Sequence, residues 1–235
     1  MKRPRKDKGR TTVNPRDLYG TGWTAEQYAA TIDQLQVLLG RYPGKQTRTE
    51  GRLSESATRQ VIARWQKLEY VEQEKLLSNS APWVWLTRQG LAQLDVPYQF
   101  YEPRVGALAH LHAINAVRLY FEAQRPADRW KSERTLRAEQ PQRASGEVAP
   151  HLPDAELYTT LGIFAIEVEL SIKEHSRLLN IMRELTSNYC TVLYFASASS
   201  FAVLESVKRQ LAPDVQGKLK VYHLEKIDGY RQIAG

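Results

Sequence analysis

The hydrophobic residues near the start of the chain recur at the spacing of a helix. A helix over residues 24–40 is predicted, with Thr24 and Gln27 as its capping box. Its apolar stripe consists of Tyr28, Ile32, Leu35 and Leu39. A second helix is predicted to follow Ser54, whose hydroxyl can cap the helix start.

The next apolar segments are too short for helices and carry the residue types of strands. Residues 71–77 and 83–87 are predicted to form a hairpin, and residues 87–94 a further helix. Helix, helix and hairpin is the order of a winged helix, in which the second helix enters the major groove of DNA. We therefore predict a winged-helix domain over residues 23–97, with a small protein-binding α/β module as the alternative.

The rest of the chain alternates between helix and strand patterns. Residues 98–107 include proline and are predicted to be a linker, and residues 108–235 to be a second domain. The expected order in that domain is α-β-β-β-α-β-α-β. The segments are a helix at 107–124, strands at 129–137, 151–158 and 163–171, a helix at 171–189, a strand at 190–197, a helix at 200–212 and a strand at 218–225. The predicted fold class is α/β (α+β).

Charge adds a possible partner. The chain has 235 residues and a net charge of +7, of which the first ten residues supply +5 through six basic groups and one acidic group. Residues 1–22 are predicted to be a basic flexible arm that either attracts DNA phosphates or only aids solubility. No apolar run has transmembrane length and no secretory signal is visible, so a cytoplasmic protein is expected. Cys190, the single cysteine, lies in an apolar run and is expected in the core.

The second predicted helix carries groups that suit DNA. Guanidinium, amide and ammonium groups can contact both phosphates and base edges. The candidate DNA-binding residues on this helix are Arg59, Gln60, Arg64 and Lys67.

Three carboxylates in the second domain are predicted to converge. Glu167 and Glu169 are two residues apart on a strand and therefore share one face. If the hairpin turns around Leu161, the numbers of facing residues sum to about 321–323, which places Asp154 opposite Glu167 or Glu169. Carboxylates repel one another, and Mg²⁺ or Mn²⁺ bound between them would relieve that repulsion.

The predicted helix after this strand brings positive charge to the same place. Ser171 and Glu174 would form its capping box, with Lys173 in the first turn and Arg177 one turn later. A metal site beside a cationic helix start suits metal-assisted phosphodiester hydrolysis. The alternative is an ordinary solvated strand with surface ion pairs from Lys173 to Glu169 and from Arg177 to Glu174.

These residues carry a resemblance to a known fold. Asp154, Glu167 and Glu169 on an αβββαβ core resemble the PD-(D/E)xK nucleases, and Pro153 precedes the aspartate as in the motif. The whole layout, a winged helix followed by "WKSER", "HLPD", "EVEL" and a lysine-bearing helix, is similar to the replication-relaxation family of plasmid and mobile-element proteins. The resemblance covers about residues 24–225.

The resemblance implies roles for individual residues. Asp154, Glu167 and the Val168 carbonyl would bind Mg²⁺ or Mn²⁺, and Glu133 would be a further ligand from the neighbouring strand. Asp154, Glu167, Glu169 and Lys173 would be the catalytic set, with Glu169 or Lys173 handling the attacking water. Arg177 would contact DNA. The chain departs from the motif, because Glu169 stands where the nucleases place lysine; some members of the wider fold carry glutamate there, and Lys173 could substitute.

The expected function is therefore that of a protein of plasmid or mobile-element replication or transfer that binds double-stranded DNA and cuts it as a metal-dependent endonuclease. The alternative is a catalytically inactive nuclease-fold accessory factor that binds DNA and recruits a replication, transfer or transposition protein. The oligomeric state is left open. His110 and His112 are spaced i,i+2 on a predicted helix, which points their rings apart and argues against a zinc site.

Overall fold

The computed structural model describes residues 12–43, 51–141 and 150–233 of the chain. It has a mixed α/β fold with two separate sheets, which confirms the predicted fold class. The chain divides into two compact units, residues 1–102 and 103–235. Within the described part, no helix combines the length and the apolar character that a membrane span would need.

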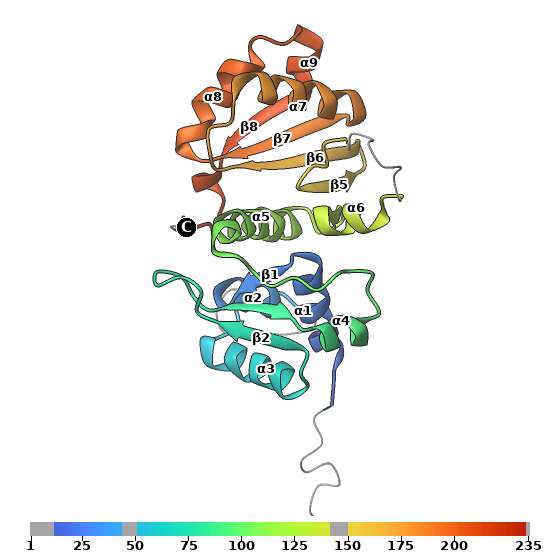
Figure 1. Cartoon of the computed structure of the whole chain (residues 1–235), viewed down its shortest axis with the longest axis vertical. Helices are drawn as coiled ribbons and strands as arrows, with labels where there is room; N and C mark the ends of the chain where they lie inside the picture. The colour runs from blue at the N-terminus through green and yellow to red at the C-terminus, as the bar shows by residue number, and fades with distance from the viewer. Residues whose placement is uncertain (1–11, 44–50, 142–149, 234–235) are drawn as a thin grey trace, which may run out of the picture. The chain divides into compact units, whose positions relative to one another are not determined.

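In its described residues, the N-terminal unit has four helices and a three-stranded antiparallel sheet in the order β1-β3-β2 (Figure 1). The elements are α1 (Pro15–Glu26), β1 (Ala29–Thr31), α2 (Ile32–Gly40), α3 (Glu55–Lys67), β2 (Val71–Glu74), β3 (Trp83–Leu86) and α4 (Arg88–Leu94). The hairpin of β2 and β3 and the helix after Ser54 were predicted, and Ser54 caps α3 through its hydroxyl. Trp65, Trp83 and Trp85 lie in the core of this unit.

The predicted helix over residues 24–40 is wrong, because the chain breaks there into α1, β1 and α2. Tyr28 has a left-handed backbone with φ of 65°, and Ala29 and Ala30 then pair with β3. The capping box belongs to Thr31 and Gln34 at the start of α2. Residues 15–22, which were predicted to belong to a flexible arm, form most of α1, while residues 1–11 of that arm lie outside the described residues.

The C-terminal unit is a five-stranded sheet in the order β4-β5-β6-β7-β8 with helices on both faces (Figure 1). β4, β5 and β6 are antiparallel neighbours, and β6, β7 and β8 are parallel neighbours. The elements are α5 (Val105–Gln124), β4 (Arg129–Ser132), α6 (Glu133–Glu139), β5 (Ala155–Thr159), β6 (Gly162–Glu169), α7 (His175–Asn188), β7 (Thr191–Ala196), α8 (Ala198–Lys208), α9 (Pro213–Lys218), β8 (Leu219–His223) and a 3-10 turn, η1 (Leu224–Lys226).

The two faces of this sheet bury separate clusters. Ile166 and Val168 of β6 pack with α5, and Ala165 packs with α7 and α8 on the other face. The β5–β6 hairpin has the predicted register, since Ala155 faces Ile166 and Thr159 faces Gly162. Gly162 has φ of 120°, a backbone conformation that favours glycine, and this allows the tight turn.

Three local predictions in this unit are corrected. The strand predicted at 129–137 ends at Ser132, whose hydroxyl caps α6, so Glu133 begins a helix. The helix predicted from Ser171 begins at His175, and Ser171 donates to Glu169 instead of forming a capping box with Glu174. Lys173 therefore lies in the loop before α7. Cys190 is exposed rather than buried, and its thiol donates to the Ile163 carbonyl at 3.0 Å.

Candidate functional site

β6 presents two carboxylates on one face of the C-terminal sheet, as the alternation of its residues predicted. Glu167 and Glu169 are only 4% and 3% exposed. Their neighbours Ile166 and Val168 point to the opposite face and pack with α5. A strand with an apolar face on one side can therefore keep two acids buried on the other side, but each buried charge then needs compensation.

Asp154 completes the acidic group from the neighbouring strand end. β5 begins at Ala155, opposite Ile166, so β6 continues beyond its partner. Beyond the start of β5, the Asp154 carboxylate replaces a backbone carbonyl as the hydrogen-bond acceptor for β6, because its Oδ2 accepts the Val168 N–H at 2.7 Å. The N–H and the carbonyl of one strand residue point to the same side, so the Val168 carbonyl faces the same edge as Asp154. Asp154, Glu167 and the Val168 backbone thus meet at the end of the hairpin.

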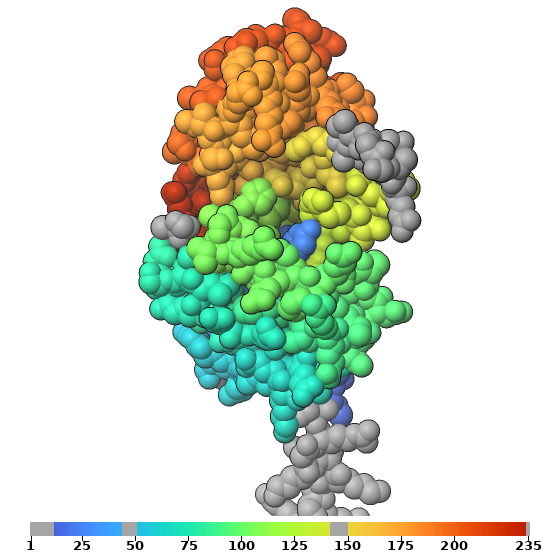
Figure 2. Space-filling model, viewed as in Figure 1, coloured from blue at the N-terminus to red at the C-terminus, as the bar shows by residue number. Residues whose placement is uncertain are grey.

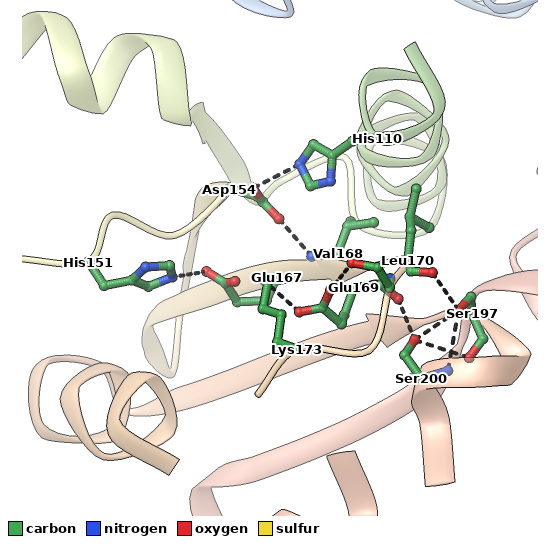
Figure 3. A network of polar contacts seen from close by, with 11 residues as sticks. His110, His151, Asp154, Glu167, Val168, Glu169, Leu170, Lys173, Ser197 and Ser200 are labelled. Atoms are coloured by element: carbon green, nitrogen blue, oxygen red, sulfur yellow. Dashed lines mark hydrogen bonds and ion pairs between the residues drawn. The ribbon is translucent and has the colours of Figure 1, made fainter. Parts of the chain in front are cut away.

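Each carboxylate has a cationic or ionisable partner within the chain (Figure 3). His110 Nε2 of α5 lies 2.9 Å from Asp154 Oδ1. The other two pairs are His151 Nε2 with Glu167 Oε1 at 3.1 Å and Lys173 Nζ with Glu169 Oε2 at 2.7 Å. The ion pair of Lys173 with Glu169 was foreseen as a surface pair, but Glu169 is buried. The three acids are therefore individually compensated by side chains of the same chain.

The pKa values of the two acids nearest the hairpin end are shifted in opposite directions. Burial, and next the charge of Asp154, raises the pKa of Glu167 to about 7 although His151 acts against this. Burial would also raise the pKa of Asp154, but His110 and the Val168 N–H outweigh burial and the net shift is downward. Burial lowers the pKa of His110, yet Asp154 reverses the shift, and the hydrogen bond to Glu167 raises the pKa of His151. Glu167 can thus exchange a proton near neutral pH beside an ionised aspartate.

The donor set suits a small hard cation. Mg²⁺ keeps several water molecules and is commonly held by only one or two carboxylates, which Asp154 and Glu167 can supply with the Val168 carbonyl. The repulsion that contributes to the raised pKa of Glu167 would be relieved by a divalent charge. Among the described residues, no group of three or more His, Cys, Asp or Glu side chains is arranged to hold a metal ion. The chain therefore offers two carboxylates for a hydrated cation, not a complete protein cage.

The carboxylate of Glu133, which was predicted as a metal ligand, is engaged within α6. Glu133 begins α6, and its carboxylate accepts the Arg137 Nε–H at 2.9 Å. The Glu133 backbone adjoins the site, where its N–H donates to the Asp154 carbonyl. Arg177 lies exposed in the first turn of α7. Glu133 is therefore not retained as a metal ligand.

His110 was missed as a site residue by the sequence reasoning, which weighed it only with His112 for zinc. The two histidines do diverge, because the His112 ring lies against Tyr230 with centroids 5.8 Å apart. The contact of His110 with Asp154 spans 44 residues and depends on how α5 packs on the sheet. No local pattern could have indicated it.

The N-terminal unit carries the other predicted residues on α3. Arg59, Gln60 and Lys67 are exposed, and α3 reaches the molecular surface, where residues 55–67 have the cyan colour of the bar (Figure 2). A concave surface lies along this helix. It is lined by Glu55, Ser56, Arg59, Gln60 and Ala63. Arg59 pairs with Glu55 at 2.7 Å, an exposed pair that a competing phosphate can replace.

Arg64 has a different environment from the other α3 candidates. Its guanidinium pairs with Asp17 of α1, with Nε 3.2 Å from Oδ2. Asp17 is fully buried and also accepts the Trp65 indole N–H at 2.9 Å and the Asn14 N–H at 3.0 Å. Arg64 therefore fixes α3 to α1, and its predicted contact with DNA is not retained.

Comparison of the chain with protein-family models, with curated proteins and with solved structures finds no match in any of the three.

Proposed function

We propose that the protein binds double-stranded DNA through its N-terminal unit and hydrolyses phosphodiester bonds with Mg²⁺ or Mn²⁺. Hydrolysis would take place at the group of Asp154, Glu167, Glu169, Lys173 and the Val168 carbonyl, which we call the β6 site. The observation that carries the proposal is the meeting of Asp154, Glu167 and the Val168 backbone where β6 outruns β5. Two carboxylates that share a site repel each other, so their pairing does not stabilise the fold. Such pairs are typical of catalytic positions. The resemblance to replication-relaxation proteins of plasmids and mobile elements gives the biological setting that we propose.

The order of elements supports this assignment for both units. α5, β4, β5, β6, α7 and β7 follow the αβββαβ order of the nuclease fold, with α6 inserted after β4. In the N-terminal unit, α1, β1, α2, α3 and the β2–β3 hairpin follow the winged-helix order, in which α3 would be the helix presented to DNA. Arg59, Gln60 and Lys67 would then contact the duplex.

The residues of the β6 site have separable tasks in this proposal. A divalent cation held by Asp154, Glu167 and the Val168 carbonyl would supply an activated water and would stabilise charge on the phosphate. Glu169 can accept the proton of the attacking water, because its carboxylate shares a face with Glu167. Lys173 lies 2.7 Å from Glu169 and can turn its ammonium group to the phosphate when Glu169 takes up a proton.

A second function is supported by the same site. Each of the three acids already has a partner in the chain, and glutamate stands where the nucleases have lysine. An accessory factor that keeps the fold for DNA binding and for recruiting a replication, transfer or transposition partner would show both features. The two functions differ in whether cleavage occurs.

The discriminating experiment uses the full chain with supercoiled, linear and single-stranded DNA in Mg²⁺, in Mn²⁺ and in EDTA. The variant Asp154→Asn/Glu167→Gln removes both charges without removing volume. Glu133→Gln is the matched control, because this acid lies next to the site but pairs with Arg137. We expect metal-dependent cleavage by the wild type and by the control, and a loss of about 100-fold or more in the double variant.

Two other results would change the conclusion. Salt-dependent DNA binding by every variant with cleavage by none would select the accessory factor. An absence of salt-dependent DNA binding would overturn both functions and favour a module for protein assembly.

A further inference from the structure

Tyr194 on β7 has a buried hydroxyl group that the acid–base pairs do not use. The residue is 1% exposed, and its hydroxyl is buried with no hydrogen-bond partner within the part of the chain that the structure describes. Tyr158 and Tyr189 differ in this respect, because both of their hydroxyls donate to Glu156, at 2.7 and 2.8 Å. A buried hydroxyl without a partner costs stability, and phenylalanine would fill the same core space without that cost.

The sheet register places the Tyr194 side chain beside that of Glu167. Glu167 of β6 and Tyr194 of β7 are direct neighbours in the parallel pair, so their side chains leave the sheet on the same face. Burial, and then the charges of Glu167, Glu169 and Asp154, raises the pKa of Tyr194 well above its ordinary value. The hydroxyl is therefore protonated at neutral pH and lies within the field of all three carboxylates.

Such a hydroxyl matches what a hydrated cation needs. Mg²⁺ and Mn²⁺ bound by two carboxylates keep water molecules, whose protons require acceptors. A tyrosine hydroxyl can accept one hydrogen bond and donate another, so it can accept a hydrogen bond from a bound water and donate its own to a neighbouring oxygen. Groups that orient a metal's ligands and waters in this way typically contribute about 10- to 100-fold to metal affinity.

We infer that Tyr194 is a positioning residue of the β6 site, whose hydroxyl contacts a water molecule of the hydrated divalent cation that Asp154 and Glu167 would hold. The inference rests on the proposed function, because it requires that this site takes up a cation. It adds a residue from a third strand that belongs to no part of the recognised motif.

The experiment measures Mn²⁺ binding to the full chain without DNA, from the spin-resonance signal of free Mn²⁺. Tyr194→Phe removes only the hydroxyl, and we expect an Mn²⁺ affinity about 10-fold weaker than that of the wild type. Tyr158→Phe is the matched control, because its hydroxyl serves Glu156, and it should bind Mn²⁺ as the wild type does. The thermal midpoint of metal-free Tyr194→Phe should be equal to or above that of the wild type. 4-Aminophenylalanine at position 194 keeps a hydrogen-bonding group and should recover part of the affinity.

The outcomes separate the inference from the proposed function. Equal Mn²⁺ affinity in the wild type and in Tyr194→Phe overturns the role of Tyr194 and leaves the cation site intact. An absence of Mn²⁺ binding by the wild type overturns the cation site and, with it, both proposals. Loss of affinity in Tyr158→Phe as large as in Tyr194→Phe would also overturn the inference, since the effect would then be a general one on the sheet.

Discussion

Each unit of the protein buries acidic side chains, but in opposite ways. In the N-terminal unit, Asp17 is a single acid that receives hydrogen bonds from Asn14, Trp65 and Arg64. In the C-terminal unit, Glu167 and Glu169 are buried on β6 and Asp154 lies directly before β5, each with one cationic or ionisable side chain as its partner. In the first site, the charge of Asp17 is compensated by its hydrogen bonds and its ion pair. In the second site, the pKa of Glu167 is raised to about 7.

The difference indicates what each site is for. A buried acid with every oxygen occupied holds elements together and has nothing left for a ligand. A set of like charges beside a hydroxyl without a hydrogen-bond partner lowers the stability of the folded chain. Such destabilising groups are retained where a bound ligand offsets their cost. Substitutions should therefore destabilise the first site and stabilise part of the second.

The largest effect on stability is expected for Asp17→Ala. The change leaves Arg64 without its counter-ion and the Trp65 indole without its acceptor. Breaking a buried pair costs about 3–5 kcal/mol, and the lower end applies because the Arg64 side chain is 27% exposed. We expect a loss of about 3 kcal/mol in the free energy of unfolding. Urea denaturation followed by tryptophan fluorescence reports it, since four of the five tryptophans lie in this unit and Trp130 lies in the other.

Asp33→Ala is the control for this prediction. Asp33 also pairs with an arginine, Arg52, but at 3.6 Å and with both side chains about half exposed or more. Its removal should leave the unfolding midpoint nearly unchanged. A similar midpoint for Asp17→Ala would contradict a structural role for the buried acid.

The opposite sign is expected for Glu167→Gln. The pKa of Glu167 is raised from 4.5 to about 7 in the folded chain, so the folded state binds more protons than the unfolded state between these values. The contribution of Glu167 to stability is thus intact below about pH 4.5 and falls as the pH rises to 7. Glutamine carries no charge, so the variant should gain about 3 kcal/mol over the wild type at pH 8.

The pH dependence of this gain in the free energy of unfolding tests the prediction. Unfolding of both proteins is measured at pH 4.5, 6 and 8 without metal, and the difference between them should grow with pH. Asp154→Asn should behave in the opposite way, because the pKa of Asp154 is lowered and its ionised form stabilises the fold. A loss of stability in Glu167→Gln at pH 8 would show that the pair with His151 outweighs the cost of the buried charge.

Local patterns predicted the parts of the fold that depend on neighbouring residues. The alternation along β6 predicted that Glu167 and Glu169 share a face, and the turn predicted the register that aligns Asp154 with them. The break of the first helix at Tyr28 could not be predicted in this way. Ala29 and Ala30 leave the helix because β3, more than 50 residues later, offers backbone hydrogen bonds and a buried place.

The site likewise combines contacts that neighbouring residues predict with contacts that depend on how distant segments pack. Lys173 was predicted beside Glu169 and is there, but in a loop, because Ser171 bonds to Glu169 instead of starting a helix. His110 and Tyr194 come from α5 and β7 and reach the acids only through packing. Arg64 was assigned to DNA because its partner Asp17 lies 47 residues earlier, where a flexible arm was expected.

The smallest effect is expected for Arg59→Ala, and it separates the two arginines of α3. Among the residues that the structure describes, Arg59 pairs with exposed Glu55, so its loss should leave the unfolding midpoint unchanged. If Arg59 contacts a DNA phosphate, the slope of log affinity against log salt should fall by about 1. Glu55→Ala, which releases Arg59 from its ion pair, should instead strengthen binding. Fluorescence anisotropy with a labelled duplex at several salt concentrations measures both. An unchanged salt slope in Arg59→Ala would remove this residue, and with it the concave face of α3, from the DNA interface.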